Sequence, residues 1–327
     1  HRVHLHEGKF MTDFVQLLVS GLALGSVYAL VALGFVVIYR ASEVFNFAHG
    51  ELLTFGALMM IYLSAAPIDE SDLFALGGSG SGGLGLPWGL AALLAITATG
   101  LLAVVIERVA LRPLVGRPVF VPIIITLFIG FILRTIMVLV WGTGSLPLET
   151  PYDAMATFTV GGVTIDYTSV WVILFSGVVL GLFFLLLRFS KLGIAMRATS
   201  SDQETALGLG IPVGKVFGVT WFVAGAFAAM AGIFVGMREP SVEAVTASYI
   251  ALRAFPAVIV GGLESPTGAV LAGLLLGVLE VLTQGYINDS FGEMSKNFHA
   301  VLPYLVMILV LVVRPYGLFG QRKVERL

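Results

Sequence analysis

The chain has 327 residues, of which 58% are hydrophobic before its 39 glycines are counted, whereas soluble domains hold about 45–50% with glycine included. Charged residues make up only 12% and the net charge is −2, so the composition excludes a soluble domain and gives no reason to expect a nucleic-acid partner. The absence of cysteine excludes disulfides, thiolate metal sites and cysteine nucleophiles. We therefore predict an integral membrane protein.

Apolar segments that could cross a bilayer recur along the chain, since a span needs about 20 mainly apolar residues. The continuous candidates are Phe14–Tyr39, Phe47–Ala66, Trp88–Leu111, Val119–Trp141, Ser169–Arg188, Val216–Met237 and Phe298–Val313. A further region is broken into Tyr249–Leu263 and Gly268–Gln284. The break is expected because Pro266 disfavours a straight continuous helix, and each half is short for a full crossing. These segments predict an all-α, polytopic transmembrane helical bundle of about eight to nine segments, some broken or re-entrant. Whether residues 40–50 and 250–267 are re-entrant stays open.

Basic residues are confined to alternate connections between these segments. Residues 107–118, residues 188–215 and the C-terminal tail carry lysine or arginine, whereas residues 67–87 and 142–168 carry only acidic charges. The basic connections are therefore predicted to be cytoplasmic and the acidic ones to lie outside. Two full crossings before residue 67 would place the N-terminus outside, and a re-entrant 40–50 segment would reverse that.

One outer connection contains alternating residues on either side of two glycines. Thr157–Val160 is followed by Gly161-Gly162 and then by Val163-Thr164-Ile165, a pattern that predicts a small periplasmic β-hairpin. The hairpin either caps the helices or forms part of a docking face for an extracellular partner.

The connection after Arg188 contains the signals of a short helix. Ser201 and Glu204 have the spacing of a capping box, and Asp202 suits the positive end of a helix. Gly210, followed by Pro212, supplies a stop. We predict a helix of roughly eight residues over Ser201–Leu209, which serves either as a surface connector or as a handle for a partner.

Polar residues at membrane depth are expensive and usually face a cavity or one another. Asn46–Glu51 lies between two apolar segments, and an unwound turn at Gly50 could present backbone groups to a small zwitterion; a plain interfacial turn is the alternative. Arg134 and Arg253 either pair with a buried carboxylate or extend to an interface, with Arg253 the better pathway candidate because it is near Gly261-Gly262. The predicted substrate-pathway residues are Asn46, His49, Gly50, Glu51, Arg253, Gly261 and Gly262.

Pairs of glycines four residues apart occur in several apolar segments and allow helices to approach closely. They are Gly21/Gly25, Gly177/Gly181, Gly232/Gly236 and Gly273/Gly277. Packing within the chain is the main interpretation, and an interface between two membrane subunits is the alternative.

Signatures of an enzyme are missing from the sequence. Gly210–Val216 resembles a phosphate-binding loop only superficially, because it has three residues between its glycines and Val216 where a hydroxyl should bind magnesium. Only His49 and His299 lie outside the N-terminal histidine run. We predict no catalytic residue, no metal site and no ATP hydrolysis by this chain.

Several separated motifs resemble the branched-chain amino acid-type ABC transporter permease family. They are Asn46-Phe47-Ala48-His49-Gly50-Glu51, then Arg197-Ala198 with Asp202, Ala206 and Gly208–Ile211, then Gly261–Ala269, and finally Arg314-Pro315-Tyr316-Gly317-Leu318-Phe319-Gly320. The similarity extends from about Val15 to Gly320 and keeps the order of the motifs.

This resemblance implies an organisation for the chain and its role. Residues 11–327 would be a single transmembrane permease domain with a cytoplasmic coupling loop at 189–215. Residues 1–10 are polar and precede Met11, so they are expected to be an N-terminal extension or a leftover of cloning. Residues implied in ATPase coupling are Arg197, Ala198, Ser201, Asp202, Glu204, Ala206, Gly210 and Ile211. The implied function is that of a permease subunit in an ATP-driven importer for branched-chain or related hydrophobic amino acids.

The resemblance also implies a set of partners in a prokaryotic cytoplasmic (inner) membrane. They are a second permease, the same or related, two cytoplasmic ATPase subunits that bind ATP and Mg²⁺, and an extracytoplasmic binding protein. No cofactor is expected on this chain. Urea, short amides or aromatic acids remain alternative substrates, and an ion-coupled secondary transporter or a scaffold or channel is the rival class.

Overall fold

A computed structural model describes residues 2–66, 83–114, 117–118, 120–153, 156–239, 241–245, 247–287 and 297–320. The acidic residues 69–72 of the first outer connection and the basic tail after residue 320 lie outside the described residues. Two compact units divide the chain: unit 1 comprises His1–Ala32, Tyr152–Val179 and Arg253–Leu327, and unit 2 comprises Leu33–Pro151 and Leu180–Leu252. The prediction of a single domain over residues 11–327 stays a prediction.

The described chain is mostly helical, which confirms the predicted fold class. The α-helices are α1 (Arg2–Ser42), α2 (His49–Ser64), α3 (Trp88–Ile106), α4 (Phe120–Trp141), α5 (Tyr167–Phe189), α6 (Lys191–Ser201), α7 (Gln203–Gly208), α8 (Val213–Arg238), α9 (Tyr249–Gly261), α10 (Pro266–Tyr286) and α11 (Phe298–Val313). A π-helical turn, η2 (Glu107–Leu111), and a 3₁₀ turn, η3 (Arg112–Leu114), continue α3. In the described part, 6 helices are long and apolar enough to cross a membrane.

The broken region near Pro266 differs from the prediction in one half. The 13 residues of α9 are about 20 Å long, short of the ~30 Å hydrocarbon core. The 21 residues of α10 are long enough, so the expectation that both halves are short is wrong for α10. The reason is local: Pro266 occupies the first helical turn, and the Ser265 hydroxyl accepts the Gly268 amide at 3.1 Å.

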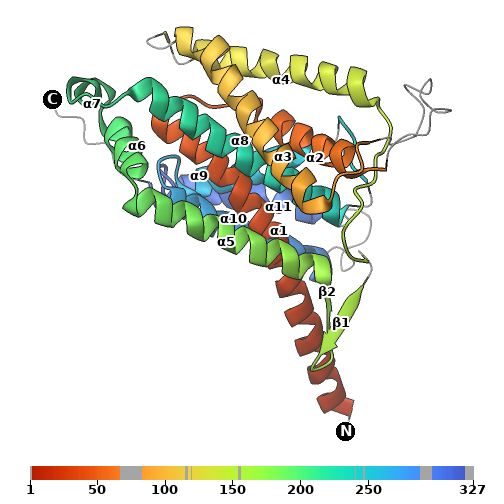
Figure 1. The fold of residues 1–327 in the computed structure, drawn as a ribbon. Coiled ribbons are helices and arrows are strands. Elements are labelled where there is room, and N and C mark those ends of the chain that lie inside the picture. The colour runs from red at the N-terminus through yellow and green to blue at the C-terminus, as the bar shows by residue number, and fades with distance from the viewer. Residues whose placement is uncertain are drawn as a thin grey trace. The chain divides into compact units, whose positions relative to one another are not determined.

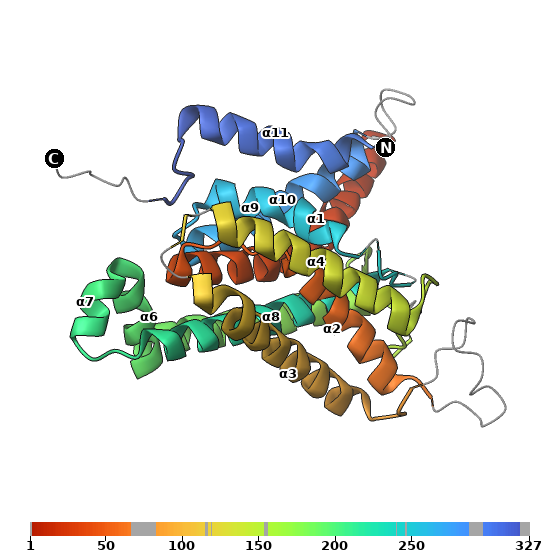
Figure 2. The same cartoon turned by 90° about the horizontal axis from the view of Figure 1, so that it is seen from above.

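In unit 2, helices α2, α3 and α8 pack on one another (Figure 2). Small residues allow this approach: a Cβ on Gly56 would lie 2.6 Å from the Ala229 Cβ, and one on Gly225 would lie 2.7 Å from the Ala103 Cβ. Trp221 of α8 is fully buried in this body. Close packing through small residues replaces the hydrophobic effect between helices in a membrane.

In unit 1, α1 and α10 meet through two of the predicted glycine pairs. A Cβ on Gly25 would lie 2.7 Å from the Leu274 carbonyl oxygen, and one on Gly273 would lie 2.6 Å from the Ala29 nitrogen. Gly21 and Gly277 lie in the same contact. The interpretation as packing within the chain is confirmed for these two pairs and for Gly232/Gly236, whereas a Cβ on Gly177 or Gly181 would have no neighbour within 4 Å.

The predicted hairpin is confirmed. Strands β1 (Thr157–Val160) and β2 (Val163–Asp166) pair antiparallel, with Thr157 opposite Asp166 and Val160 opposite Val163 (Figure 1). Gly161 and Gly162 have φ of 60° and 86°, which a two-residue turn of this hand requires and which glycine adopts without strain.

Candidate functional site

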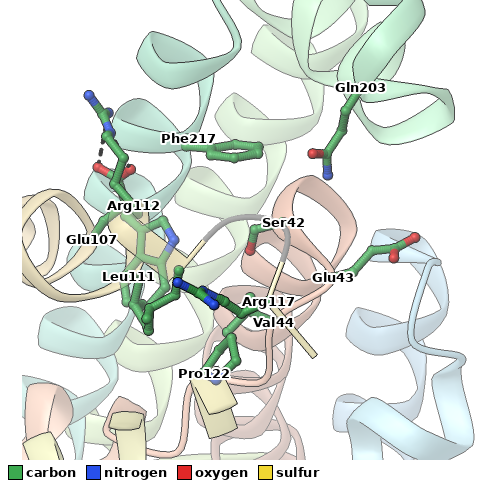
Figure 3. A pocket seen from close by; sticks show the side chains of 12 residues that line it. Ser42, Glu43, Val44, Glu107, Leu111, Arg112, Arg117, Pro122, Gln203 and Phe217 are labelled. Carbon is green, nitrogen blue, oxygen red and sulfur yellow. Dashed lines mark hydrogen bonds and ion pairs between the residues drawn. The ribbon is translucent and has the colours of Figure 1, made fainter. Parts of the chain in front are cut away.

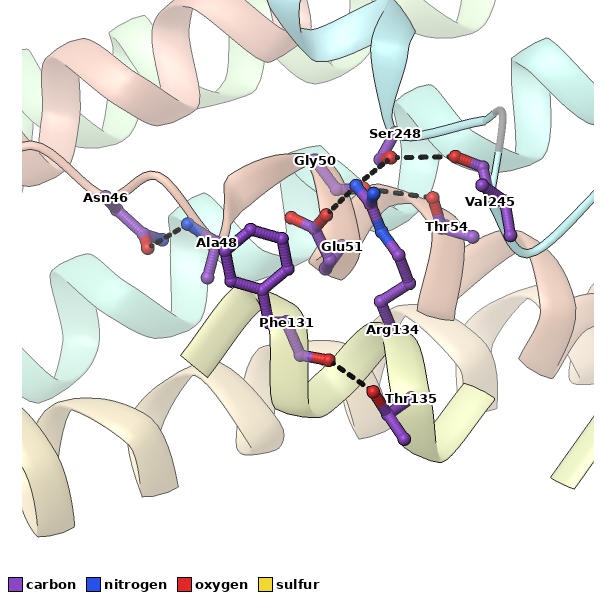
Figure 4. Close-up of polar contacts among 10 residues, drawn as sticks. All are labelled: Asn46, Ala48, Gly50, Glu51, Thr54, Phe131, Arg134, Thr135, Val245 and Ser248. Carbon is purple, nitrogen blue, oxygen red and sulfur yellow. Dashed lines mark hydrogen bonds and ion pairs between the residues drawn. The ribbon is translucent and has the colours of Figure 1, made fainter. Parts of the chain in front are cut away.

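The connection between α1 and α2 is irregular and belongs to unit 2, where it borders two features. One is a cavity lined by Ser42, Glu43 and Val44 together with residues of η2, α7 and α8 (Figure 3). The other is a polar cluster around Glu51 (Figure 4). Four of the predicted pathway residues, Asn46 to Glu51, lie along this connection and the first turn of α2.

Hydrogen bonds to α4 and within the connection hold this irregular segment. The Phe47 amide donates to the Thr126 hydroxyl at 3.2 Å, and that hydroxyl is 3.2 Å from the Phe45 carbonyl oxygen. The Asn46 side-chain oxygen accepts the Ala48 amide at 3.1 Å. The backbone before α2 is therefore fixed in an unwound form. The predicted unwound turn at Gly50 is wrong, because Gly50 lies in the first turn of α2 and the irregular residues precede it.

Glu51 of α2 forms an ion pair with Arg134 of α4 (Figure 4). The Arg134 Nη2 is 2.5 Å from Glu51 Oε1 and donates to the Ser248 hydroxyl at 2.9 Å. The Arg134 side chain is 26% exposed and the Glu51 side chain is 8% exposed, so most of the ion pair is buried within the protein. A Cβ on Gly130 would lie 3.3 Å from Glu51 Oε2, so the glycine leaves room for the carboxylate.

His49 is completely buried in the first turn of α2. Its ring centroid lies 4.5 Å from that of Phe35, and a Cβ on Gly34 would come within 2.6 Å of the imidazole Cε1. Neither ring nitrogen has a hydrogen-bond partner among the described residues, and the Asn46 amide nitrogen also lacks one. Buried polar atoms are normally satisfied, so these nitrogens are exceptions among the described residues; the place of Asn46 and His49 on a substrate pathway stays a prediction.

The remaining predicted pathway residues lie in unit 1. Arg253 is exposed on α9 and acts electrostatically on Glu280, which accepts the Tyr28 hydroxyl at 2.8 Å. Gly262 has φ of 98°, and a Cβ there would lie 2.7 Å from the Gly320 nitrogen. The Leu318 amide donates to the Val260 carbonyl at 2.8 Å, so two of the family-like motifs pack on each other. Their place on a substrate pathway stays a prediction.

Arg134 was not among the predicted pathway residues, although the sequence carried a signal for it. It is the single charged residue of the apolar stretch Val119–Trp141, and a charge inside a span indicates a partner. The partner, Glu51, is 83 residues away in the chain, and only the fold brings the two together.

The predicted coupling segment consists of two helices rather than one. Helix α6 begins after Ser190, whose hydroxyl accepts the Gly193 amide at 2.9 Å, and it ends at Ser201. Helix α7 begins after Asp202, whose carboxylate accepts the Thr205 amide at 3.0 Å and the Thr205 hydroxyl at 2.6 Å. The capping box of Ser201 with Glu204 is therefore wrong, because the Ser201 hydroxyl donates to the Arg197 carbonyl.

The predicted coupling residues have different surroundings. Arg197 donates to the Leu187 carbonyl and holds the turn between α5 and α6, Ala198 is half-buried, and Gly210 ends the segment with φ of 81°. Ala206 is 2% exposed and packs with Ala41, Val213 and Phe217, against which Ile211 also lies. Ala206 therefore faces the body of unit 2, and the outward positions are Leu207 and Leu209, which are 58% and 77% exposed.

The corrected cap makes a prediction for α7. We expect Asp202→Ala to make the amides of residues 203–205 exchange hydrogen severalfold faster, because the first turn loses its acceptor. The two hydrogen bonds from Thr205 lower the pKa of Asp202, so the cap is intact above the ordinary pKa and is lost as pH falls through the lowered one. Glu204→Ala is the matched control, since Glu204 is exposed and makes no cap; equal exchange in both variants would contradict the assignment.

The fold and this site together define a polytopic membrane protein with an irregular polar connection between two helices and an exposed helical segment. Among the described residues no group of three or more His, Cys, Asp or Glu could hold a metal.

The sequence matches the family described as branched-chain amino acid transport system / permease component over residues 17–311, and the chain belongs to this family. It is 32% identical to the high-affinity branched-chain amino acid transport system permease protein BraD of Pseudomonas aeruginosa, over 96% of this chain and 98% of that protein. It is 29% identical to the protein of the same description, LivH, of Salmonella typhimurium, over 96% and 97%. A probable permease protein LivH of Methanocaldococcus jannaschii is 28% identical over 95% of each chain.

Proposed function

We propose that this chain is the membrane-spanning subunit of an ATP-driven importer for branched-chain or related hydrophobic amino acids. The names of the relatives support the substrate class. The observation that carries the mechanism is the α6–α7 segment, which exposes Leu207 and Leu209 outside the candidate spans. A chain with no nucleotide site needs such a handle to receive work from an ATPase, and a capped short helix can transmit it as a rigid element.

The complex would contain a second permease, two cytoplasmic ATPases and an extracytoplasmic binding protein that delivers the amino acid. ATP and Mg²⁺ would bind to the ATPase subunits, and this chain would bind no cofactor. Its location would be the cytoplasmic membrane of a prokaryote, in keeping with the organisms of its relatives. The unwound connection Asn46–Ala48 and buried His49 would contact the amino acid on its route.

The importer assignment is tested with proteoliposomes that contain the complete complex. We expect radiolabelled L-leucine to enter only when ATP is present on the ATPase side and the binding protein on the other side. Urea, acetamide and benzoate serve as competitors that report the alternative substrates. Uptake by this chain alone, driven by an ion gradient, would overturn the proposal.

The coupling role predicts a specific loss when the outward leucines become charged. We expect the double variant Leu207→Asp/Leu209→Asp to insert normally but to lose ATPase co-purification and at least about tenfold of ATP-driven uptake. The reason is that docking would bury the two new carboxylates in an apolar interface without a partner, which is costly. Val160→Asp, which changes a similarly exposed apolar residue in β1, is the matched control for insertion and for ATPase co-purification.

Unchanged co-purification and uptake in the double leucine variant would show that α7 is only a connector. Ala206→Trp is not a suitable probe of docking, because Ala206 packs inside unit 2 and the change would disturb that packing first.

A further inference from the structure

We propose that the cavity beside the end of α1 is a binding site for a small carboxylate with an apolar side chain, of the L-leucine type. The cavity lies within unit 2, next to residues 107–118 and α7, on the side predicted to be cytoplasmic. The choice of L-leucine as ligand rests on the proposed function, whereas the chemistry of the site rests on its lining.

The size of the cavity suits a molecule no larger than an amino acid. Its volume is about 240 Å³, below the ~300–1,000 Å³ of pockets that hold drug-sized ligands. It is nevertheless several times the ~30 Å³ that one water occupies in the liquid. A small organic ligand therefore fits.

Two separate irregularities of the backbone converge on this cavity. Glu43 follows the last residue of α1 and lines the cavity. Its φ of 54° is in the left-handed region, and among the described residues it is the only one other than glycine with a positive φ. Glu107 and Leu111 come from the π-helical turn η2. Strained residues and π-turns are both concentrated at functional sites, and here one of each, from different segments, lines the same cavity.

The lining contains both apolar and polar side chains. Val44, Leu111, Leu114, Pro122, Phe217 and Trp221 supply apolar surface, Ser42 and Gln203 supply neutral polar groups, and Glu43 supplies a carboxylate. Glu107 is already paired with Arg112 at 3.0 Å, and the Arg112 Nη2 also donates to the Gly214 carbonyl at 2.6 Å, so that pair is occupied in the structure (Figure 3).

Arg117 supplies the remaining positive charge. It is exposed, and its guanidinium points into the space between Val44 and Leu111 (Figure 3). Its amide donates to the Leu114 carbonyl at 2.9 Å, whereas its side chain makes no hydrogen bond or ion pair with the described residues. A guanidinium binds a carboxylate with two parallel hydrogen bonds. The apolar side chains of the lining then select a carboxylate with a hydrocarbon side chain over a bare inorganic anion, and Gln203 or Ser42 can accept a hydrogen bond from an ammonium group.

Equilibrium binding of radiolabelled L-leucine to the full chain in lipid nanodiscs, without ATPase subunits, tests this site. We expect saturable binding that Arg117→Gln weakens at least about tenfold, as loss of a charge-assisted pair should, and that Arg117→Lys weakens less. Arg108→Gln is the matched control, because Arg108 is an exposed arginine of the same connection that does not line the cavity. Val44→Phe, which fills the cavity while keeping every charge, should also weaken binding.

Competitors define the ligand class in the same assay. The 2-oxo acid 4-methyl-2-oxopentanoate should compete with L-leucine, because it keeps the carboxylate and the side chain, and inorganic phosphate should not. Equal binding by the wild type and Arg117→Gln, or equal competition by phosphate, would overturn the proposal. ATP-driven uptake by the complete complex is measured separately: normal uptake without an Arg117-dependent site refutes this inference alone, whereas absent uptake refutes the importer function.

Discussion

Replacement of Arg134 by methionine is expected to destabilise the protein by about 3–5 kcal/mol, the usual penalty for leaving one charge of a buried pair without its partner. Glu51 is only 8% exposed and receives its hydrogen bond from Arg134. Methionine is unbranched and replaces most of the apolar stem of arginine, so packing against α2 should be largely preserved. The loss is measured as a lower thermal transition of the detergent-solubilised full chain.

The double variant Glu51→Gln/Arg134→Met separates charge from packing. Removing both charges together should recover most of the lost stability, because replacing a whole buried pair by uncharged groups is often neutral or favourable. Thr135→Ala, on the next position of α4, is the control, since its hydroxyl only donates to the Phe131 carbonyl on an exposed face. A double variant no more stable than Arg134→Met would show that the ion pair is not the cause.

Replacement of Gly25 by leucine is expected to separate α1 from α10 and to abolish a monodisperse, folded protein. A Cβ at this position would already lie 2.7 Å from the Leu274 carbonyl oxygen and 2.8 Å from its Cα, and backbone atoms cannot move aside as a side-chain end can. Overpacking a core typically lowers the free energy of unfolding by about 1–3 kcal/mol, so a clash with backbone atoms should exceed that range. Size-exclusion chromatography of the full chain measures the result.

Gly177→Leu provides the matched control for Gly25→Leu. Gly177 belongs to a glycine pair with the same four-residue spacing, but a Cβ there would have no neighbour within 4 Å of the described chain. We expect Gly177→Leu to remain monodisperse. If both variants behave alike, the close approach of α1 to α10 does not explain the glycines.

Local chemistry made much of the fold predictable from the sequence. Runs of about 20 apolar residues, the length that a bilayer requires, predicted where the long helices lie. The Gly161-Gly162 turn predicted the position of the hairpin. Pro266 and Gly210 set ends of helices. Each of these signals depends only on neighbours in the chain, which is why a single sequence reveals it.

The cap of α7 shows how a local signal can still be ambiguous. Ser201 with Glu204 and Asp202 with Thr205 offer two starts that differ by one residue. The choice depends on where α6 ends, and α6 ends at Ser201 because its hydroxyl returns to the Arg197 carbonyl. The sequence indicated a capped helix, but the position of the cap required the preceding helix.

Tertiary structure alone decided which faces of the spans meet. A helix that is apolar on every side has no stripe that marks its buried face, so neither the pairing of Arg134 with Glu51 nor the contact of Gly25 with Leu274 could be derived from periodicity. The same holds for Ala206, whose side chain packs on Ala41, Val213 and Phe217 and does not face outward. The amino-acid sequence by itself determined that this chain is a membrane permease. It also indicated the polar connection at Asn46–Glu51 and a capped helix between two spans. The rotation of each helix about its axis, fixed by contacts between residues far apart in the chain, decided which polar groups are paired and which line a cavity.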